Sequence, residues 1–331
     1  MKENEIRPAK FQNELKRLMD IDASRMLSKF DNFVFVSCPA CDSESSDPLF
    51  EKYDLTYNRC NECETIFISP RPTVDILNYF YKGSPNYKFW NENIFPATRD
   101  IRRKKLFRPR AKKIIELINS HIPEADSLIE IGSGQGFFIE EIISLRKFKN
   151  ILAVEPTKGL ADTLRGKDIE VIEDIIENMD KKYNGNFDIL VNFEVIEHLF
   201  SPKEFLLRSK ELLKEKGIIF ITCPNGKGFD NMVLGKESIT FDYEHLNYFN
   251  PKSIKTLLNN SGFEVLSVET PGKLDVDLVK KALDQKRIDL ADNIFLKTIL
   301  EDQNSMELEQ FQKYLSDNGL SGHLQVVARK L

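Results

Sequence analysis

The residues whose types and spacing could do chemistry are densest in a glycine-rich stretch at residues 128–138, LIEIGSGQGFF. A short apolar run that contains Glu130 comes first, and three glycines follow it at alternate positions: Gly132, Gly134 and Gly136. An apolar segment then resumes, so the pattern predicts a buried strand, a tight turn and the first turn of a helix. Because glycines lack side chains and a helix start offers free N–H groups, a ligand can lie directly against the backbone here.

An acidic residue, Glu155, follows about 20 residues beyond this turn, near the end of the apolar run NILAVEPT. A carboxylate at that place can accept hydrogen bonds from both hydroxyl groups of a ribose. A nicotinamide or flavin site would need G-x-G-x-x-G/A, but Phe137 stands where that fingerprint requires a small residue. The two segments therefore indicate a nucleotide-like ligand and argue against a dinucleotide.

Four of the five cysteines form two CxxC pairs, Cys38 with Cys41 and Cys60 with Cys63. Two thiolate pairs on tight turns suit tetrahedral Zn²⁺, and because four thiolates fill its coordination sphere, we expect this zinc to be structural. The alternative is that these are incidental cysteines of a small, loop-rich segment. Acidic residues outnumber Lys52 and Arg59 around the pairs, so we do not expect this segment to bind phosphate or nucleic acid.

Two histidines are candidate proton acceptors, because imidazole titrates near neutral pH. His198 closes the segment EVIEH, where Glu197 could either orient the ring or cap a helix, and His245 lies in EHLNYFNP. Both segments fall in loops where we expect the carboxyl ends of strands, the edge at which open α/β sheets bind ligands. A structural role for either histidine stays open, and we expect His121 and His323 to be structural.

An aromatic run followed by a basic run gives residues 71–110 an unusual composition. A half-buried linker followed by a solvated helix would explain it. The alternative is a lid over the ligand, in which rings stack on a base or sugar and arginines hold an anionic group. The residues that we assign to such a lid are Tyr87, Trp90, Arg99 and Arg103.

Composition and charge narrow the class of protein. The chain has 331 residues, of which 41% are hydrophobic and 30% charged, as in a water-soluble protein with a packed core. Its apolar runs fall short of the roughly 18 residues that cross a membrane, and its first residues lack the apolar region of an export signal. Together with the CxxC pairs, this predicts a protein of the reducing cytoplasm. The net charge of −5 makes nucleic acid an unexpected partner.

The elements that would position these groups divide the chain into four parts. Residues 1–30 predict an amphipathic helix that packs or self-associates. Residues 31–70 carry the cysteine pairs, and residues 71–110 form the connection. In residues 111–331 strands and helices alternate, which predicts an α/β fold with a parallel sheet and helices on both faces.

Two features near the end of the chain extend this pattern. A helix should begin at Ser201-Pro202 and end at Gly217. The segments FEVLSVET and HLQVVARKL read as two more strands that could close the sheet as an antiparallel pair. The helical insertion between them, at about 275–319, could cap the site or mediate dimerisation, and a homodimer stays open.

The combination of these segments resembles class I S-adenosylmethionine-dependent methyltransferases. E-I-G-x-G-x-G is similar to the first motif of that family, EVIEH and CPN are similar to its later strand ends, and the resemblance spans about 110–270 and the terminal strand. The CxxC pairs, SPRPT and EHLNYFNP resemble a subgroup with an N-terminal zinc ribbon, many of whose members act in sugar or surface-polysaccharide pathways. The resemblance implies a Rossmann-like sheet, mostly parallel with an antiparallel last strand, and S-adenosyl-L-methionine as the cofactor.

The resemblance also implies roles for individual residues. Glu155, followed by Pro156, would hold the adenosyl ribose, and Asp174 or its neighbour Glu173 would contact the adenine amino group. Glu130 and the glycines would complete the cofactor cradle. The residues expected around the methionine part and the methyl group are Asn192, Phe193 and Glu194.

The sequence thus predicts methyl transfer to a small, anionic acceptor such as a sugar, a nucleotide-sugar or a related metabolite. His198 or His245 would remove a proton where the acceptor needs to lose one, and the protein would mainly position the two partners. Two alternatives stay open at this point. One is a methyltransferase acting on RNA or protein, and the other is a non-catalytic protein that binds S-adenosylmethionine.

Overall fold

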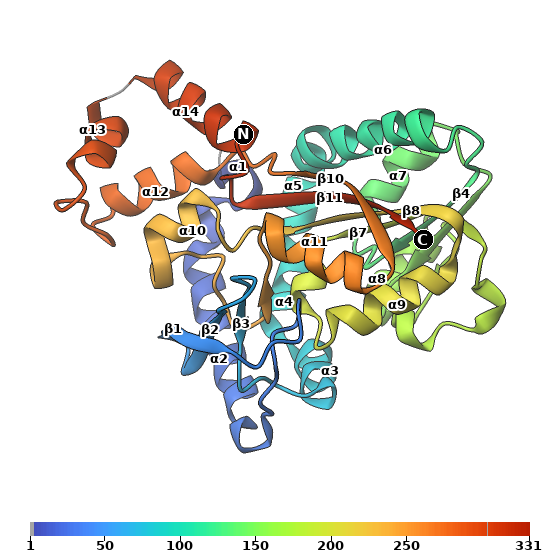
Figure 1. Ribbon diagram of the computed structural model, residues 1–331, viewed down its shortest axis with the longest axis horizontal. Coiled ribbons are helices and arrows are strands. Elements are labelled where there is room, and N and C mark those ends of the chain that lie inside the picture. The colour runs from blue at the N-terminus through green and yellow to red at the C-terminus, as the bar shows by residue number, and fades with distance from the viewer. Residues whose placement is uncertain (1–2, 303) are drawn as a thin grey trace.

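A central sheet of seven strands organises the molecule in the computed structural model, which describes residues 3–302 and 304–331 (Figure 1). Its strand order is β10-β11-β8-β7-β4-β5-β6, with β11 antiparallel to both neighbours and the other pairings parallel. The strands are β4 (Ser127–Ile131), β5 (Asn150–Val154), β6 (Val171–Ile172), β7 (Phe187–Phe193), β8 (Leu213–Pro224), β10 (Phe263–Glu269) and β11 (His323–Lys330). The expected Rossmann-like sheet with an antiparallel last strand is confirmed.

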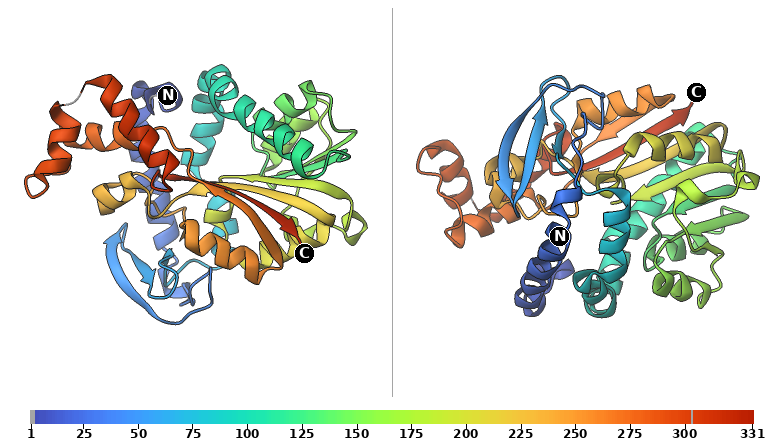
Figure 2. Two further views of the ribbon diagram at one scale, coloured as in Figure 1. Left: turned by 45° about the horizontal axis from the view of Figure 1, so that its top comes forward. Right: turned by 90° about the horizontal axis from the view of Figure 1, so that it is seen from below.

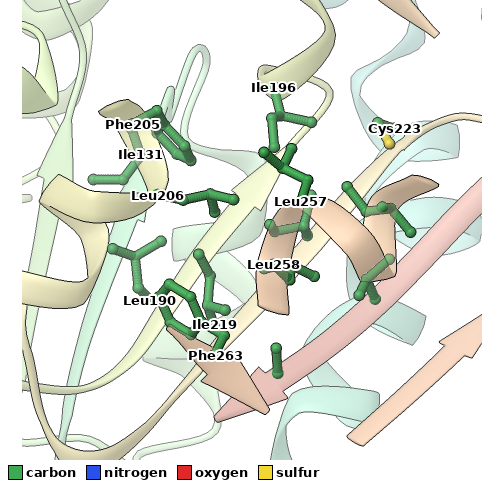
Figure 3. Close-up of a cluster of buried hydrophobic side chains, with 14 of the residues drawn as sticks. Ile131, Leu190, Ile196, Phe205, Leu206, Ile219, Cys223, Leu257, Leu258 and Phe263 are labelled. Carbon is green, nitrogen blue, oxygen red and sulfur yellow. The ribbon is translucent and has the colours of Figure 1, made fainter. Parts of the chain in front are cut away.

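Helices cover both faces of this sheet, which explains why β4 is buried along its whole length. One face packs against α6 (Arg108–His121), α7 (Phe137–Ser144) and α8 (Lys158–Arg165). The other packs against α9 (Pro202–Leu212) and α11 (Pro251–Asn260). Figure 3 shows this second layer, where Phe205 and Leu206 of α9 and Leu257 and Leu258 of α11 lie against Leu190 and Ile219 of the sheet.

Helix α9 differs from its predicted extent. Ser201 caps its start as expected, with its side chain accepting a hydrogen bond from Glu204 N. The helix ends at Leu212, however, and the expected end at Gly217 is wrong. Leu213 already pairs with Phe187 of β7, so residues that suit a helix by composition form the start of a strand. Sheet pairing overrides helix propensity here.

A second, four-stranded sheet carries the cysteine pairs, in the order β1-β2-β3-β9. Its first three strands follow one another in the chain: β1 (Ser46–Lys52), β2 (Leu55–Cys60) and β3 (Ile66–Ile68). Its fourth, β9 (Asn247–Tyr248), comes from the segment EHLNYFNP and pairs with β3. Residues 31–70 are therefore joined to the main domain through a shared sheet.

The side chain of Arg71 fastens this junction. It is fully buried, and its guanidinium donates to Phe200 O and to Asn247 Oδ1, at 3.1 Å each. Burial lowers the pKa of Arg71 to about 9. A buried guanidinium needs such partners because an unpaired one is costly, so the ribbon and the loop around β9 are held in a fixed relation.

The N-terminal segment forms α1 (Glu3–Ile6) and α2 (Gln12–Leu27). Helices α3 (Val74–Gly83), α4 (Pro85–Phe89) and α5 (Phe95–Arg102) follow the ribbon, and π-helical turns at Trp90–Ile94 and Arg103–Phe107 join α4, α5 and α6. Glu5 pairs with Lys105 at 2.5 Å, and Glu3 pairs with Lys281 at 2.6 Å. Helix α1 therefore bridges the arm of residues 85–107 and the C-terminal insertion.

The insertion between β10 and β11 consists of three helices, α12 (Asp275–Asp284), α13 (Ile294–Asp302) and α14 (Ser305–Asp317). With α10 (Phe229–Leu234) they form a separate hydrophobic cluster beside the main sheet (Figures 1 and 2). Across the described residues, no helix combines the length and the apolar character needed to span a bilayer.

Candidate active site

A large cleft of about 2240 Å³ opens at the carboxyl ends of the central strands. Strand β4 has β5 on one side and β7 on the other, so the chain order reverses at this point of the sheet. Ligands bind to open α/β sheets at such a reversal, because the loops that follow the two flanking strands diverge there. The cleft is walled further by α2, by the arm of residues 85–107 and by the insertion.

The three glycines of the turn have different neighbours. A Cβ atom at Gly132 would lie 2.5 Å from Val195 Cγ2, and one at Gly136 would lie 2.5 Å from Leu164 Cδ2. Those two glycines permit close packing, and Gly136 is the N-cap residue of α7. At Gly134 a Cβ atom would meet nothing within 4 Å in the described part of the chain. Gly134 is therefore the glycine past which a ligand can reach the backbone.

Glu155 joins this turn to the strand next to it. Its carboxylate accepts hydrogen bonds from Gly134 N at 2.8 Å and from Thr157 N at 2.9 Å. Burial raises the pKa of Glu155, against the lowering effect of these two N–H groups. Each carboxylate oxygen has a second lone pair. The side chain can thus hold the turn and still accept hydrogen bonds from a diol lying in the cleft.

Several other residues of the expected cofactor set also line the cleft: Glu130, Pro156, Glu173, Asp174, Phe193 and Glu194. Asp174 Oδ1 accepts from Ile175 N and from Asn178 Nδ2, both at 2.8 Å, while Glu173 pairs with Arg165 at 2.9 Å. Asn192 and Gly136 lie behind the cleft wall rather than on it.

Glu130 supplies a test of whether a polar ligand fits. It is 3% exposed, and among the described residues its Oε2 atom has no hydrogen-bond partner. Burial raises the pKa of Glu130 well above its ordinary value. A buried polar atom without a partner is costly, and Glu130 faces the cleft beside the open Gly134. These features fit the polar groups of an adenosyl-methionine ligand, which would supply the missing partner.

Glu194 directly follows β7, on the side of the cleft where we expect the methionine part of the ligand. Its backbone is left-handed, with a φ of 55°. Its carboxylate accepts from Arg110 at 2.9 Å and from Thr222 Oγ1 at 2.7 Å, and it lies 3.7 Å from His323 Nε2. Burial acts to raise the pKa of Glu194, but the charges of His323 and Arg110 hold it below its ordinary value. Arg110 and His323 therefore belong to the cleft, which the sequence did not reveal.

His198 and His245, from separate segments, come together with their ring centroids 4.5 Å apart. Both line the cleft. His245 Nδ1 lies 3.0 Å from Thr240 O and 3.3 Å from the Asp242 carboxylate. A carbonyl oxygen only accepts, so Nδ1 carries the hydrogen and Nε2 is the atom left to take a proton. His245 has the arrangement of a general base supported by a carboxylate.

His198 has a less favourable setting for proton transfer. Its Nδ1 atom lies 3.2 Å from Glu244 O and 3.1 Å from Tyr81 Oη. Burial, and after it the charge of His245, lowers the pKa of His198 to about 3. The ring is therefore neutral at pH 7 and holds an added proton poorly, which suits a residue that positions its neighbours.

Glu197 lies behind the histidines and is 1% exposed. Its backbone carbonyl accepts from Leu246 N at 2.8 Å, and this bond ties EVIEH to the loop of His245. Burial, and then the charge of Glu194, raises the pKa of Glu197 well above its ordinary value. One carboxylate oxygen of Glu197 and one nitrogen of each histidine lie within 4.8 Å of one another, a spacing that would also admit a divalent cation.

Three further polar side chains complete the region around the histidines: Tyr81, Tyr87 and Glu244, all of which line the cleft. Tyr87 was expected there, but Tyr81 and Glu244 were missed. Glu244 Oε1 accepts from Asn86 Nδ2 at 3.4 Å, and burial raises the pKa of Glu244 to about 8. Its position next to His245 in the chain was the one available signal.

The expected lid is present only in part. Tyr87 and Trp90 line the cleft, and the Arg102 guanidinium lies 5.6 Å from the Trp90 ring. Arg99 instead pairs with Glu140 at 2.6 Å, and Arg103 pairs with Glu141 at 2.7 Å, both on α7. These two arginines brace the arm against α7, away from the cleft wall, because α7 presents acidic residues to them. The expected contact of Arg99 and Arg103 with a substrate is not retained.

The four cysteines of the two pairs converge, as their spacing predicts. The sulfur atoms of Cys38 and Cys63 are 3.5 Å apart, as are those of Cys41 and Cys60, and all four lie within 4.8 Å of one another. Cys38, Cys60 and Cys63 are buried. Four thiols at this mutual distance can surround one tetrahedral Zn²⁺ ion.

Known proteins give this site a family. A model of the methyltransferase domain family matches residues 101–268. The chain belongs to the methyltransferase domain family. It is similar to a ubiquinone biosynthesis O-methyltransferase of Rickettsia bellii, with 27% identity over 173 residues that make up 47% of this chain and 70% of the relative. The expected enzyme class, an S-adenosylmethionine-dependent methyltransferase, is confirmed.

Two other similar proteins belong to the same class. A probable S-adenosylmethionine-dependent methyltransferase of Mycobacterium tuberculosis is 23% identical over 141 residues, 42% of this chain and 49% of the relative. The 1,6-didemethyltoxoflavin-N1-methyltransferase of Burkholderia thailandensis, solved with S-adenosylhomocysteine, has a TM-score of 0.48 and 11% identity. That comparison covers 86% of this methyltransferase and 99% of the solved chain.

Proposed function

We propose that this methyltransferase transfers a methyl group from S-adenosylmethionine to a small acceptor that must lose a proton. The observation that carries the proposal is the joint position of two groups in one cleft. The open glycine Gly134, held by Glu155, lies at the ends of β4 and β5. The paired histidines lie in the same cleft, His198 after β7 and His245 just before β9.

Residues at the carboxyl ends of the central strands would bind the donor. Glu155 would accept hydrogen bonds from the ribose hydroxyls, and Asp174, or Glu173 beside it, would receive the adenine amino group. Phe193, Glu194 and Glu130 would surround the methionine part. When bound, the sulfonium supplies an already activated methyl group, so the chain has to position the two partners rather than activate the donor.

The acceptor side carries the proton chemistry. His245 would take the acceptor's proton at Nε2 while its Nδ1–H donates to Thr240 O and Asp242 supports the positive charge that forms. The neutral His198 and the residues Tyr81 and Glu244 would orient the acceptor. A hydroxyl group needs such a base, and the relatives named O-methyltransferases favour transfer to oxygen.

A sugar or a related metabolite of surface-polysaccharide or nucleotide-sugar chemistry is the proposed acceptor class. Supporting it are the resemblance of the ribbon and EHLNYFNP to methyltransferases of those pathways and a cleft of about 2240 Å³, which is large enough for both substrates. We infer a cytoplasmic setting as well, because all five cysteines are outside disulfide bonds, as is usual in a reducing compartment.

We propose that Cys38, Cys41, Cys60 and Cys63 hold one structural Zn²⁺ ion. The metal would fix the ribbon whose β3 strand pairs with β9, and it would thereby position His245. Metal analysis of the purified chain should find one zinc per chain. The Cys38→Ser variant should lose it, and a fully folded chain without metal would contradict the assignment.

The experiment that tests the proposed activity uses labelled donor. The full chain is incubated with S-adenosyl-[methyl-³H]methionine and a panel of sugar phosphates and nucleotide-sugars, and transfer of label is measured. We expect label to pass to a member of the panel. Binding of neither S-adenosylmethionine nor S-adenosylhomocysteine in calorimetry would overturn the proposal.

A further inference from the structure

Two cations from distant parts of the chain meet on one short loop at the mouth of the cleft. Lys52 ends β1 of the ribbon, and its Nζ atom donates to Ser238 O at 2.7 Å. Arg287 follows α12 of the insertion, and its Nη1 atom donates to Glu237 O at 3.1 Å. The two acceptor carbonyls belong to consecutive residues, and the guanidinium is close enough for its charge to act on the ammonium. Both side chains line the cleft.

Neither cation has a direct ion pair within the described residues. Lys52 donates to the neutral carbonyl of Ser238, and Arg287 donates to Glu237 O and to the neutral amide oxygen Oε1 of Gln285 at 3.1 Å. The nearby Asp242 is engaged elsewhere, since its Oδ1 accepts from Glu244 N and His245 N at 2.9 Å each. Two neighbouring positive charges repel each other, and more strongly away from water.

The electrostatics of Lys52 agree with this geometry. Burial lowers the pKa of Lys52, the charges of Asp242 and Glu237 partly restore it, and the charge of Arg287 lowers it further. Lysine is most stable as a cation when an anion is close. A group with negative charge placed between Lys52 and Arg287 would therefore relieve both the burial and the repulsion.

The loop that carries these cations also orients the proposed base. Thr240 N donates to Ser238 Oγ at 3.1 Å, and Thr240 O accepts from His245 Nδ1. Ser238 and Thr240 are two residues apart, so their Cα atoms are separated by at most about 8 Å. An acceptor of sugar size could thus reach from the cation pair to His245.

We propose that Lys52 and Arg287 form a subsite for a phosphate or diphosphate group of the methyl acceptor, whose reacting group then lies at His245. This inference rests on the proposed function and narrows it to phosphate-bearing acceptors. Two facing cations match a group with about two negative charges, as a phosphate has, better than a single carboxylate. The arginine fork adds paired hydrogen bonds to phosphate oxygens, and the lysine acts as a point charge.

The subsite also revises the expectation about the ribbon. Its acidic composition argued against phosphate binding, and most of its surface keeps that character. Lys52 is an exception because the β1–β2 hairpin places its side chain at the cleft, beside Tyr53 and on the same loop as Arg287 of the insertion. The insertion thus completes the acceptor site rather than standing apart from it.

The test measures binding of inorganic pyrophosphate to the full chain by calorimetry, with saturating S-adenosylhomocysteine present to fill the donor side. We expect affinity for pyrophosphate to fall about 10- to 100-fold in Lys52→Met and in Arg287→Met, the loss expected for one charge-assisted contact. Lys52→Arg should recover most of the affinity. Lys255→Met, which removes an exposed lysine of α11 outside the cleft, serves as the matched control and should bind like the unaltered chain.

The subsite would be overturned by unchanged affinity in both methionine variants, by an equal loss in Lys255→Met, or by equally tight binding of malonate as a carboxylate probe. Arg287 is exposed, so its replacement leaves the packing intact, and unchanged affinity for S-adenosylhomocysteine verifies the fold of each variant. Failure of the unaltered chain to bind S-adenosylhomocysteine would instead contradict the proposed function. Donor binding without any pyrophosphate binding would contradict the subsite alone.

Discussion

The two walls of the cleft are built in different ways. The donor wall, formed by Gly132, Gly134, Glu155, Phe193 and Glu194, comes from three adjacent parallel strands and the turns directly after them. The acceptor wall combines the ribbon hairpin, the loop of residues 237–248 and the insertion. Backbone groups and short turns shape the first wall, whereas side chains from remote segments shape the second.

Because the two walls are built differently, substitutions should affect donor specificity and acceptor specificity in different ways. The donor wall is tied to strand ends, so altering it alters the sheet. The acceptor wall depends on side-chain contacts such as those of Lys52 with Ser238 and of Arg287 with Glu237. Substitution of these flexible side chains can change the contacts without changing the fold. We therefore expect donor binding and acceptor binding to respond separately to substitution.

The largest expected effect comes from His245 on the acceptor wall. In His245→Gln, the rate of methyl transfer should fall about 10²- to 10⁴-fold, the usual contribution of a general base. Affinity for S-adenosylmethionine should stay within about twofold, because the ring lies outside the donor wall. Transfer of labelled methyl to the acceptor found in the panel, measured across pH, checks both statements.

The matched control is His198→Gln, which removes the neighbouring ring. Because its low pKa disfavours proton uptake, we expect a smaller loss and an unchanged pH profile. A larger loss in His198→Gln than in His245→Gln would reverse the two roles.

The sequence predicted which residues come together at the strand ends, because these residues are close along the chain. The turn at Gly132–Gly136 and Glu155 after the next strand form one local pattern, and parallel strands bring such ends together. The spacing of the four cysteines likewise predicted their convergence, since each pair is local and one metal joins them.

The acceptor wall could be predicted only in part. His245 was a candidate through its segment, but nothing local pairs Lys52 with Arg287 or joins β3 to β9. For the same reason, the sequence could not decide whether Arg99 and Arg103 of the basic run face a ligand or a helix, because the choice depends on Glu140 and Glu141 of α7. Such choices depend on tertiary packing, which periodicity does not encode.

A smaller effect should appear in the stability of the acceptor wall at different pH values. Asp230 of α10 is buried beside Asp275 of α12, and burial and then the charge of Asp275 raise the pKa of Asp230 from 3.8 to about 7. A raised pKa contributes stability that is complete below pH 3.8 and is lost as pH rises through about 7. Relative to Asp230→Asn, the unaltered chain should therefore lose about 4 kcal/mol between those limits, of which about 3 kcal/mol falls between pH 5 and pH 8.

Urea unfolding at pH 5 and pH 8 measures this difference. Asp284→Asn, an exposed aspartate of the same insertion, is the control and should follow the unaltered chain. An unfolding free energy of Asp230→Asn that runs parallel to that of the unaltered chain would contradict the assignment.

The smallest expected effect is a difference of about 1–3 kcal/mol in stability between two glycine substitutions, which separates packing from ligand contact on the donor side of the cleft. Gly134→Ala and Gly136→Ala both place a side chain at positive φ, which costs about 1–2 kcal/mol. Gly136→Ala also meets Leu164 and should lower stability by about 1–3 kcal/mol more. Gly134→Ala should mainly weaken binding of S-adenosylmethionine. Thermal unfolding and calorimetry of both variants check this, and equal stability losses with equal affinities would refute the distinction.

The most direct test of donor binding at the ends of β4 and β5 is the affinity of the full chain for S-adenosylmethionine. Calorimetry would compare the unaltered chain with Glu155→Gln and Glu116→Gln. Glu155 holds Gly134 and would bind the ribose, while Glu116 is exposed on α6. We expect the unaltered chain and Glu116→Gln to bind alike and Glu155→Gln to bind at least about tenfold more weakly, as loss of a hydrogen bond to a charged group predicts. Unchanged affinity in a folded Glu155→Gln variant would show that the donor does not lie on these strand ends.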